Sequence, residues 1–199
     1  WRWCGYATEK NANRLLSNHS RTKVIQEEYT DRKNSILSTI SNDGDLNEIL
    51  HTDMSLVLQN DMLVKVDLMS MANSLEVRVP FLSHHVVNFA FTLPEESKIT
   101  ADMKKRILQS AFREILPPEL YDRPKHGFEV PLLEWLRTDL KSLIEDDLLN
   151  DDFIRDQDIF KINETRRLKK QLFSNNPGDS HARIWALIVF QWWFKKYMM

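Results

Sequence analysis

Glycine and proline are scarce in this sequence, and their scarcity limits the possible folds more than any other feature. The 199 residues include only four Gly and seven Pro, and long stretches contain neither. Gly and Pro mark the turns between short strands, so a chain that lacks them over long stretches favours helices. The sequence therefore predicts a mainly α-helical fold.

The spacing of apolar residues predicts where these helices lie. A break is expected near Gln59-Asn60-Asp61 in the second of them, and Pro117-Pro118 ends the fourth. The last helix is apolar on nearly all sides between Ile184 and Phe194, which predicts that the rest of the fold encloses it. The predicted helices cover residues 22–39, 46–74, 84–93, 102–116, 131–143, 157–173 and 180–197.

Composition argues against several classes of protein. A formal net charge of −2, with basic and acidic residues interleaved, provides no positive field for nucleic acid. Cys4 is the only cysteine, so no internal disulfide can form, and no Cys or His spacing matches a zinc site. No apolar run reaches the ~18 residues of a membrane span. We expect a cytoplasmic chain without a metal site of its own and without a membrane or nucleic-acid partner.

Two short segments contain the residues best suited to chemistry. The second of them begins a few residues after the double proline and reads Asp122-Arg123-Pro124-Lys125-His126-Gly127-Phe128. Lys125 comes directly after a rigid proline and two residues before a glycine, so its ammonium is expected to be held in place without being packed away. Such a cation suits the binding of phosphate oxygens. The alternative is a solvated lysine that pairs with Asp122 or Glu129.

The first segment, Leu75-Glu76-Val77-Arg78-Val79-Pro80-Phe81-Leu82-Ser83, alternates charged and apolar residues at its start. In an extended chain, Glu76 and Arg78 share one face and the two valines share the other. The charges are interpreted either as a part of a site or as a buried structural ion pair. The valines line a passage or belong to a packed core, and Ser83 can cap the helix that follows.

In this order and spacing, the two segments resemble the synthetase domain of glutamine-hydrolysing asparagine synthetases, the asparagine synthetase B family. That family contains Arg-Pro-Lys-x-Gly-Phe and Leu-Glu-x-Arg-x-Pro-Phe-Leu-Asp, and residues 65–72 resemble its Lys-Val-Asp-Arg-x-Ser-Met-Ala helix. Leu68 replaces the arginine of that helix and Ser83 replaces the final aspartate of the longer motif. The resemblance extends over essentially the whole chain.

The resemblance implies roles for individual residues. Lys125 is expected to contact the phosphates and the β-aspartyl-adenylate, with Arg123 in a positioning role and Gly127 setting the backbone conformation. Glu76 and Arg78 are expected beside the acceptor site. The remaining candidates are Val77 and Val79 for an ammonia passage, Asp67 with Ser70 near the site or on a polar helix surface, and Lys104 with Lys105 on a solvated face.

The resemblance also implies that the chain is a piece of a larger enzyme. It corresponds to the helical C-terminal part of an adenine nucleotide α-hydrolase-like (ATP pyrophosphatase) domain, with residues 1–199 as one domain and the parallel sheet largely missing. The absent partners are the N-terminal glutaminase and the nucleotide-binding half, which in the full-length protein use ATP and Mg to activate aspartate for ammonia. The isolated chain is therefore expected to be inactive.

Two other interpretations stay open. The same architecture serves amidotransferases that act on other carboxylates, such as those of sugars or peptides. A helical interaction module without chemistry, in which the Lys125 loop is a docking surface, belongs to a different class.

Overall fold

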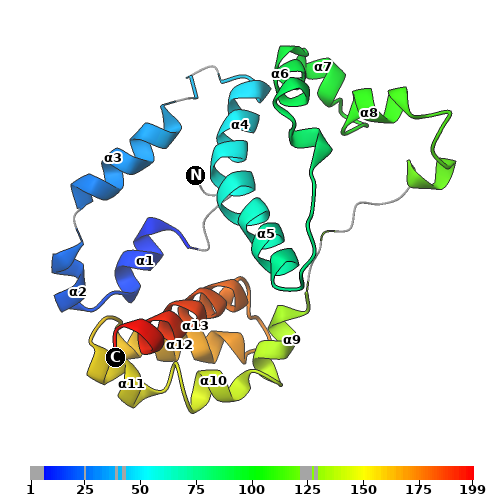
Figure 1. Ribbon diagram of the computed structural model, residues 1–199. Coiled ribbons are helices and arrows are strands. Elements are labelled where there is room, and N and C mark those ends of the chain that lie inside the picture. The colour runs from blue at the N-terminus through cyan, green and yellow to red at the C-terminus, as the bar shows by residue number, and fades with distance from the viewer. Residues whose placement is uncertain (1–6, 25, 39, 42–43, 122–126, 128–129) are drawn as a thin grey trace. The chain divides into compact units, whose positions relative to one another are not determined.

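The computed structural model describes residues 7–24, 26–38, 40–41, 44–121, 127 and 130–199, and in these residues the chain is mainly helical, as predicted (Figure 1). The described part contains no strand, only isolated bridges between Leu16 and Phe160 and between Ile99 and Lys104. Its contacts divide the chain into two compact units, unit 1 with residues 1–30 and 128–199 and unit 2 with residues 31–127. No described helix is long and apolar enough to cross a membrane.

Unit 1 is a helical bundle whose longest member, α13, has the bounds that the sequence predicts. The predicted helix 131–143 is two helices, because Thr138 leaves helical geometry at φ −120° and ψ −91°. The predicted helix 157–173 is also wrong in its first turn, since Asp158 adopts a left-handed conformation with φ 51°. The helices are α1 (Glu9–Leu15), α2 (Asn18–Lys23), α9 (Leu132–Arg137), α10 (Lys141–Glu145), α11 (Asp151–Gln157), α12 (Ile162–Leu172) and α13 (Ser180–Tyr197).

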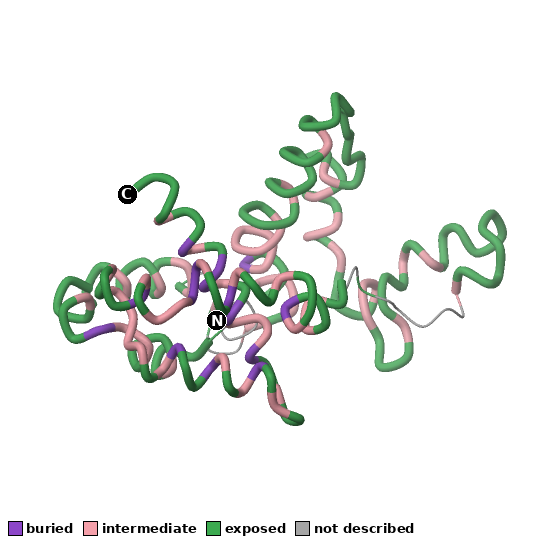
Figure 2. The backbone as a smooth tube through the Cα atoms, turned by 90° about the horizontal axis from the view of Figure 1, so that it is seen from below, coloured by how far each residue is buried: buried purple, intermediate pink, exposed green. Residues whose placement is uncertain are grey.

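All the buried apolar residues of the described chain belong to unit 1, where they form one cluster (purple in Figure 2). Leucine and isoleucine side chains from five helices and the turn between α10 and α11 meet there. Burying each such side chain contributes roughly 1.5–3 kcal/mol. The cluster comprises Leu136, Ile144, Leu148, Leu149, Ile154, Leu168, Leu172, Ile184, Leu187 and Ile188.

Helix α13 packs by one face only. Ile184, Leu187 and Ile188 are buried. Trp185 and Trp192 are 38% and 56% exposed. The prediction that α13 is enclosed on all sides is therefore wrong for this chain, because its main contacts are with α9 and α12 and side chains such as Val189 and Trp192 stay exposed.

Unit 2 contains a long helical segment followed by shorter pieces. The predicted break near residues 59–61 is wrong: the chain continues through a π-helical stretch, and the Asn60 side chain donates to the carbonyl oxygens of Ser55 and Leu56. The predicted helix 102–116 is reduced to α8. The elements are α4 (Leu46–Asp53), η2 (Met54–Met62), α5 (Leu63–Met71), η3 (Pro80–Leu82), α6 (His84–Thr92), α7 (Glu95–Lys98), α8 (Arg106–Ala111) and η4 (Pro118–Leu120), with α3 (Gln26–Leu37) across the boundary of the units.

Unit 2 has no buried apolar cluster among its described residues. Thr52 is the one residue there that is buried. Large apolar side chains such as Leu68, Phe89 and Ile115 are more than half exposed. A helical unit that leaves so many apolar side chains uncovered presents surface suited to further protein contacts.

Candidate functional site

The segment 75–83 begins where α5 ends in a tight turn. Ser74 has a left-handed backbone with φ 56°, and the Leu75 amide donates to the carbonyl oxygen of Ser70 at 2.9 Å. The Asn73 side chain donates to the Met69 carbonyl oxygen at 2.9 Å. These bonds satisfy the last carbonyls of the helix and direct the chain into residues 75–79, which have no regular structure.

Glu76 and Arg78 form an ion pair, as their shared face predicts, but the pair is not buried. The two side chains are 66% and 86% exposed. Val77 and Val79 are also exposed, at 44% and 45%, so they do not belong to a packed core in this chain. The interpretation of a buried structural ion pair is therefore wrong here, because no apolar element of unit 2 covers this stretch.

Ser83 immediately precedes α6, and the prediction that its hydroxyl caps that helix is wrong. Its side chain makes no capping hydrogen bond. The η3 turn instead orders this corner: the Ser83 amide donates to the Pro80 carbonyl oxygen at 3.2 Å, and the Val87 amide donates to the Ser83 carbonyl oxygen at 2.9 Å. The backbone rather than the hydroxyl joins the motif to α6.

A cleft of about 790 Å³ in unit 2 contains residues next to both motif segments. Phe81, from the first segment, lies on one wall, and Tyr121 lies on another. Tyr121 directly precedes Asp122, the first residue of the second segment. Its hydroxyl donates to the Phe112 carbonyl oxygen at 2.6 Å, which fixes the chain at the point where the second segment begins.

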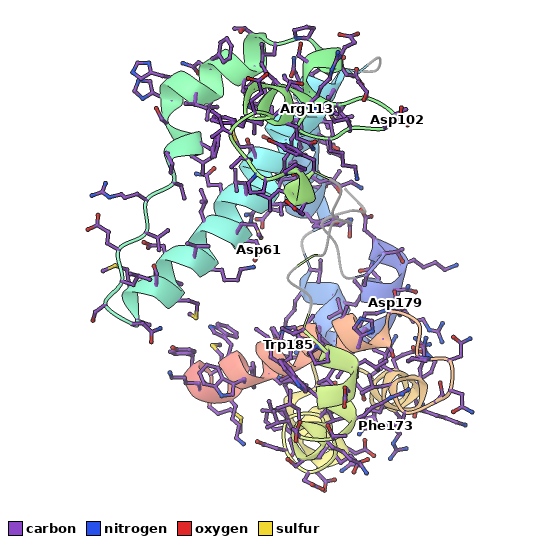
Figure 3. The ribbon with its side chains drawn as sticks, turned by 90° about the vertical axis from the view of Figure 1, so that its right-hand side faces the viewer. Asp61, Asp102, Arg113, Phe173, Asp179 and Trp185 are labelled. Carbon is purple, nitrogen blue, oxygen red and sulfur yellow. The ribbon has the colours of Figure 1, made fainter. Side chains whose placement is uncertain are left out.

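The cleft carries more positive than negative charge. Lys104, Lys105 and Arg113 line it, together with the single carboxylate of Asp102 (Asp102 and Arg113 are labelled in Figure 3). Lys104 and Lys105 are exposed, as predicted, but the sequence did not single out Arg113. The available signal was their order in the chain, between one motif and the other. A cluster of cations in a concave surface can bind phosphate oxygens.

The backbone at Lys105 has an unusual geometry. Lys105 has a left-handed conformation with φ 56° at the start of α8. The Gln109 side chain donates to the Lys104 carbonyl oxygen at 2.7 Å. The Thr100 backbone amide donates to the Met103 carbonyl oxygen at 2.8 Å. Strained residues of this kind persist only where their surroundings hold them, and they cluster at functional sites.

An apolar hollow of about 670 Å³ adjoins the cleft and shares part of its wall. Phe81, Leu108 and the two lysines line both spaces. The hollow's other walls come from α4, α6 and α8. A charged cleft beside an apolar hollow is a combination found in small-molecule sites.

The remaining candidates that the structure describes do not line this cleft. Ser70 donates to the Asp67 carbonyl oxygen at 3.1 Å, and both residues lie on α5 without lining the cleft. Gly127 is exposed. Lys125 and Arg123 lie outside the described residues.

The cleft suits the phosphates of ATP better than it suits Mg. Its cations match phosphate oxygens, but Asp102 is its one carboxylate among the described residues. The described chain contains no group of three or more His, Cys, Asp or Glu placed to hold a metal ion. The described lining of the cleft is therefore better suited to an anion than to a metal ion.

Comparison with known proteins gives consistent matches. The family described as Asparagine synthase matches residues 1–195. Asparagine synthetase [glutamine-hydrolyzing] 1 of Bacillus subtilis (strain 168) is 28% identical over 198 residues, which are 96% of this chain and 30% of that protein. The putative asparagine synthetase [glutamine-hydrolyzing] of Mycobacterium tuberculosis (strain ATCC 25618 / H37Rv) is 35% identical over 145 residues, 72% of this chain and 22% of that protein. The chain thus spans less than a third of the length of these relatives. No solved structure matches it.

Proposed function

Because the chain belongs to the asparagine synthase family, we propose that it is the helical C-terminal part of a glutamine-hydrolysing asparagine synthetase. The whole enzyme uses ATP to adenylate the β-carboxylate of aspartate, with release of pyrophosphate. Ammonia from glutamine then displaces AMP to give asparagine. The reaction takes place in the cytoplasm.

The cleft of unit 2 is the observation that best supports this proposal. It joins Phe81 of one family motif to Tyr121, which adjoins the other, and it presents Lys104, Lys105 and Arg113. Positive charge that is already in position stabilises the negative charge that develops during adenylate formation and attack. These cations therefore complement the role proposed for Lys125.

Lys125 contacts the phosphates and the aspartyl-adenylate in this proposal. Arg123 positions that lysine, and Gly127 gives the loop the conformational freedom of glycine. The loop starts one residue after Tyr121, whose hydroxyl is bonded to the backbone of α8's C-cap residue, Phe112. That attachment supports a loop that begins at the edge of the cleft.

The stretch 75–79 supplies the wall beside the acceptor site. The Glu76–Arg78 pair lies on one of its faces, and Val77 and Val79 face the ammonia passage. Asp67, one helix earlier, approaches the same region. The first four of these side chains are more than 40% exposed, and Asp67 is exposed on α5. Such exposure suits residues that meet a substrate or another part of the protein.

The rest of the enzyme completes the site and the fold. The nucleotide-binding half brings a parallel sheet of the ATP pyrophosphatase type with the loops for pyrophosphate and Mg, and residues 1–199 join it as one domain. The N-terminal glutaminase supplies ammonia. The uncovered apolar side chains of unit 2 support this arrangement, since burying them requires a partner. The 199-residue chain alone is therefore inactive.

A substitution in the full-length protein tests the proposal. Lys125→Ala is expected to lower aspartate-dependent AMP formation from ATP and ammonia by about 10²–10³-fold. Lys141→Ala is the matched control, because Lys141 lies on α10, where it pairs with Glu145 at 3.4 Å and lies over the Phe173 ring. Unchanged AMP formation by a folded Lys125→Ala variant would contradict the catalytic role and favour a non-catalytic helical module.

Leu68 and Ser83 favour a second candidate within the same chemistry. They stand where the family pattern has arginine and aspartate, so the acceptor could be a carboxylate of a sugar or peptide. The full-length enzyme should be supplied with ATP, ammonia and either aspartate or these other carboxylates. Turnover with another acceptor and none with aspartate would select the second candidate.

A further inference from the structure

A small cavity of about 240 Å³ lies in unit 1 between α1, α12 and α13. It shares no lining residue with the cleft of unit 2. Two backbone hydrogen bonds hold α1 beside α12: Ser17 donates to Ile159 and Lys161 donates to Leu15, both at 2.8 Å. The Arg14 side chain adds an ion pair to Glu164 at 2.7 Å. Helix α1 is thus fixed in place, although side chains do not fill all the space between it and α12.

Small side chains line part of the cavity. Ala12 comes from α1, Ala186 from α13 and Ala7 from the residues before α1. Larger apolar residues form its floor, where the rings of Phe160 and Phe190 meet edge to face at 5.3 Å. A hollow lined in this way accepts an apolar group but no polar one.

The rim of the cavity is polar and carries excess positive charge. Arg167 and Arg14 both donate to Glu164, so this carboxylate is fully engaged. Burial raises the pKa of the Glu164 carboxyl, but the hydrogen bonds from Arg167 and Arg14 outweigh this effect and leave the pKa below its ordinary value. Glu164 is therefore ionised and balances one arginine, which leaves the other uncompensated.

Arg183 offers a free donor at the same rim. Its guanidinium pairs with Asp179 through Nη2, while the Nε–H is buried and has no hydrogen-bond partner among the described residues. The side chain is only 16% exposed and lines the cavity. A buried donor without a partner is rare in folded proteins and calls for an acceptor that the described part of the chain does not supply.

From these features, we propose that the cavity binds a small monocarboxylic acid with an apolar body. The carboxylate accepts the Nε–H of Arg183, and the apolar body fills the space between Ala12, Ala186 and Phe190. Among the residues that line the cavity, the positive charges of Arg167 and Arg183 exceed the one negative charge of Glu164, which favours an anion over a neutral molecule. The cavity volume limits the ligand to about the size of an amino acid or a phenyl-substituted acid.

The probe for this site is 4-fluorophenylacetate, followed by fluorine NMR with the full-length protein. We expect saturable binding with a dissociation constant on the order of 1 mM or tighter. The neutral analogue 4-fluorotoluene should bind at least about tenfold more weakly, because it cannot accept the Nε–H. No saturable binding of the acid, or equal binding of the two probes, would overturn the proposal.

Two substitutions test the two halves of the site. Arg183→Lys keeps the charge and the pairing with Asp179 but removes Nε, so it should weaken the acid about tenfold without changing the binding of 4-fluorotoluene. Arg166→Lys is the control, because Arg166 pairs with Asp151 outside the cavity. Ala186→Leu should abolish binding of both probes by filling the hollow. Acid binding that survives Ala186→Leu, or that falls equally in both Arg→Lys variants, would also overturn the proposal.

Discussion

Gln157 and Gln191 exchange two side-chain hydrogen bonds, at 2.6 and 2.9 Å, so that each amide is both donor and acceptor. Gln191 is completely buried on α13, and Gln157 ends α11. The pair places one polar link beside an otherwise apolar cluster. Because each group satisfies the other, the register between α11 and α13 is set by this contact.

Replacing Gln157 with Ala should leave the buried Gln191 amide without a partner. The expected loss in the free energy of unfolding is about 1–3 kcal/mol, the cost of an unsatisfied buried polar group. Urea denaturation measures it. The double variant Gln157→Leu with Gln191→Leu should recover much of the loss, and a single variant as stable as the wild type would disprove the role of the pair.

Because the buried apolar residues lie in unit 1, we expect a Leu→Ala substitution there to lower the free energy of unfolding more than one in unit 2. Leu172→Ala should lower the free energy of unfolding by about 2–5 kcal/mol, because Leu172 is completely buried. Leu68→Ala is the matched control and should change it by less than about 0.5 kcal/mol, since Leu68 is 57% exposed. Equal losses in the two variants would contradict the placement of the core.

Asp151 predicts a loss of stability in acid. The hydrogen bond from Arg166, at 2.7 Å, is the main reason that the pKa of the Asp151 carboxyl lies below its ordinary value of 3.8, and Lys169 at 3.3 Å adds to it. A carboxyl whose pKa is lower in the folded state stabilises fully above its unfolded pKa and loses that contribution as the pH falls through the folded pKa. The stability difference between the wild type and Asp151→Asn should therefore shrink below about pH 4.

The stability difference between the wild type and Asp151→Asn is expected to be below about 1 kcal/mol, because Arg166 is well exposed and solvent screens the pair. Thermal unfolding of both proteins across this pH range measures the difference. A difference that stays constant from neutral pH to strong acid would show that Asp151 does not act through its charge.

A substitution of Lys105 can separate the effect of its charge on activity from the effect of its left-handed backbone on stability. Lys105→Gly in the full-length protein removes the ammonium but suits the left-handed backbone at φ 56°. Stability should change by less than about 1 kcal/mol, while AMP formation falls by about 10²-fold if the cleft binds phosphate. Ser74→Gly is the matched control, since Ser74 has the same φ and does not line the cleft. Unchanged turnover in Lys105→Gly would remove this cleft from the site.

The bounds of α13 could be predicted because its signals are local. Asn175-Asn176-Pro177-Gly178 ends the preceding helix, and the apolar run from Ile184 begins within the next turn. The break at Asp158 could not be predicted in the same way. No Gly or Pro marks it, and the hydroxyls of Ser17 and Ser20 stabilise it by donating to the Asp158 carbonyl oxygen at 2.6 and 3.2 Å from the other end of the chain.

The candidate site also has features that the sequence could predict and features that it could not. Alternation alone predicted that Glu76 and Arg78 pair, because neighbouring residues determine which side chains share a face. Their exposure could not be predicted, since burial depends on elements far away in the sequence. The sequence assigned Lys104 and Lys105 to a solvated face, and both are exposed, but only the structure shows that they line a cleft together with Phe81.

By itself the sequence determined the helical class, the likeness to asparagine synthetases and the positions of the two motifs, because periodicity and short motifs depend on nearby residues. Only the tertiary structure decided that the apolar core lies in unit 1, that a cationic cleft adjoins both motifs, and that Arg183 has an unpaired donor beside a hollow. These outcomes depend on which distant surfaces meet, and contacts between distant residues have no signature in a local pattern.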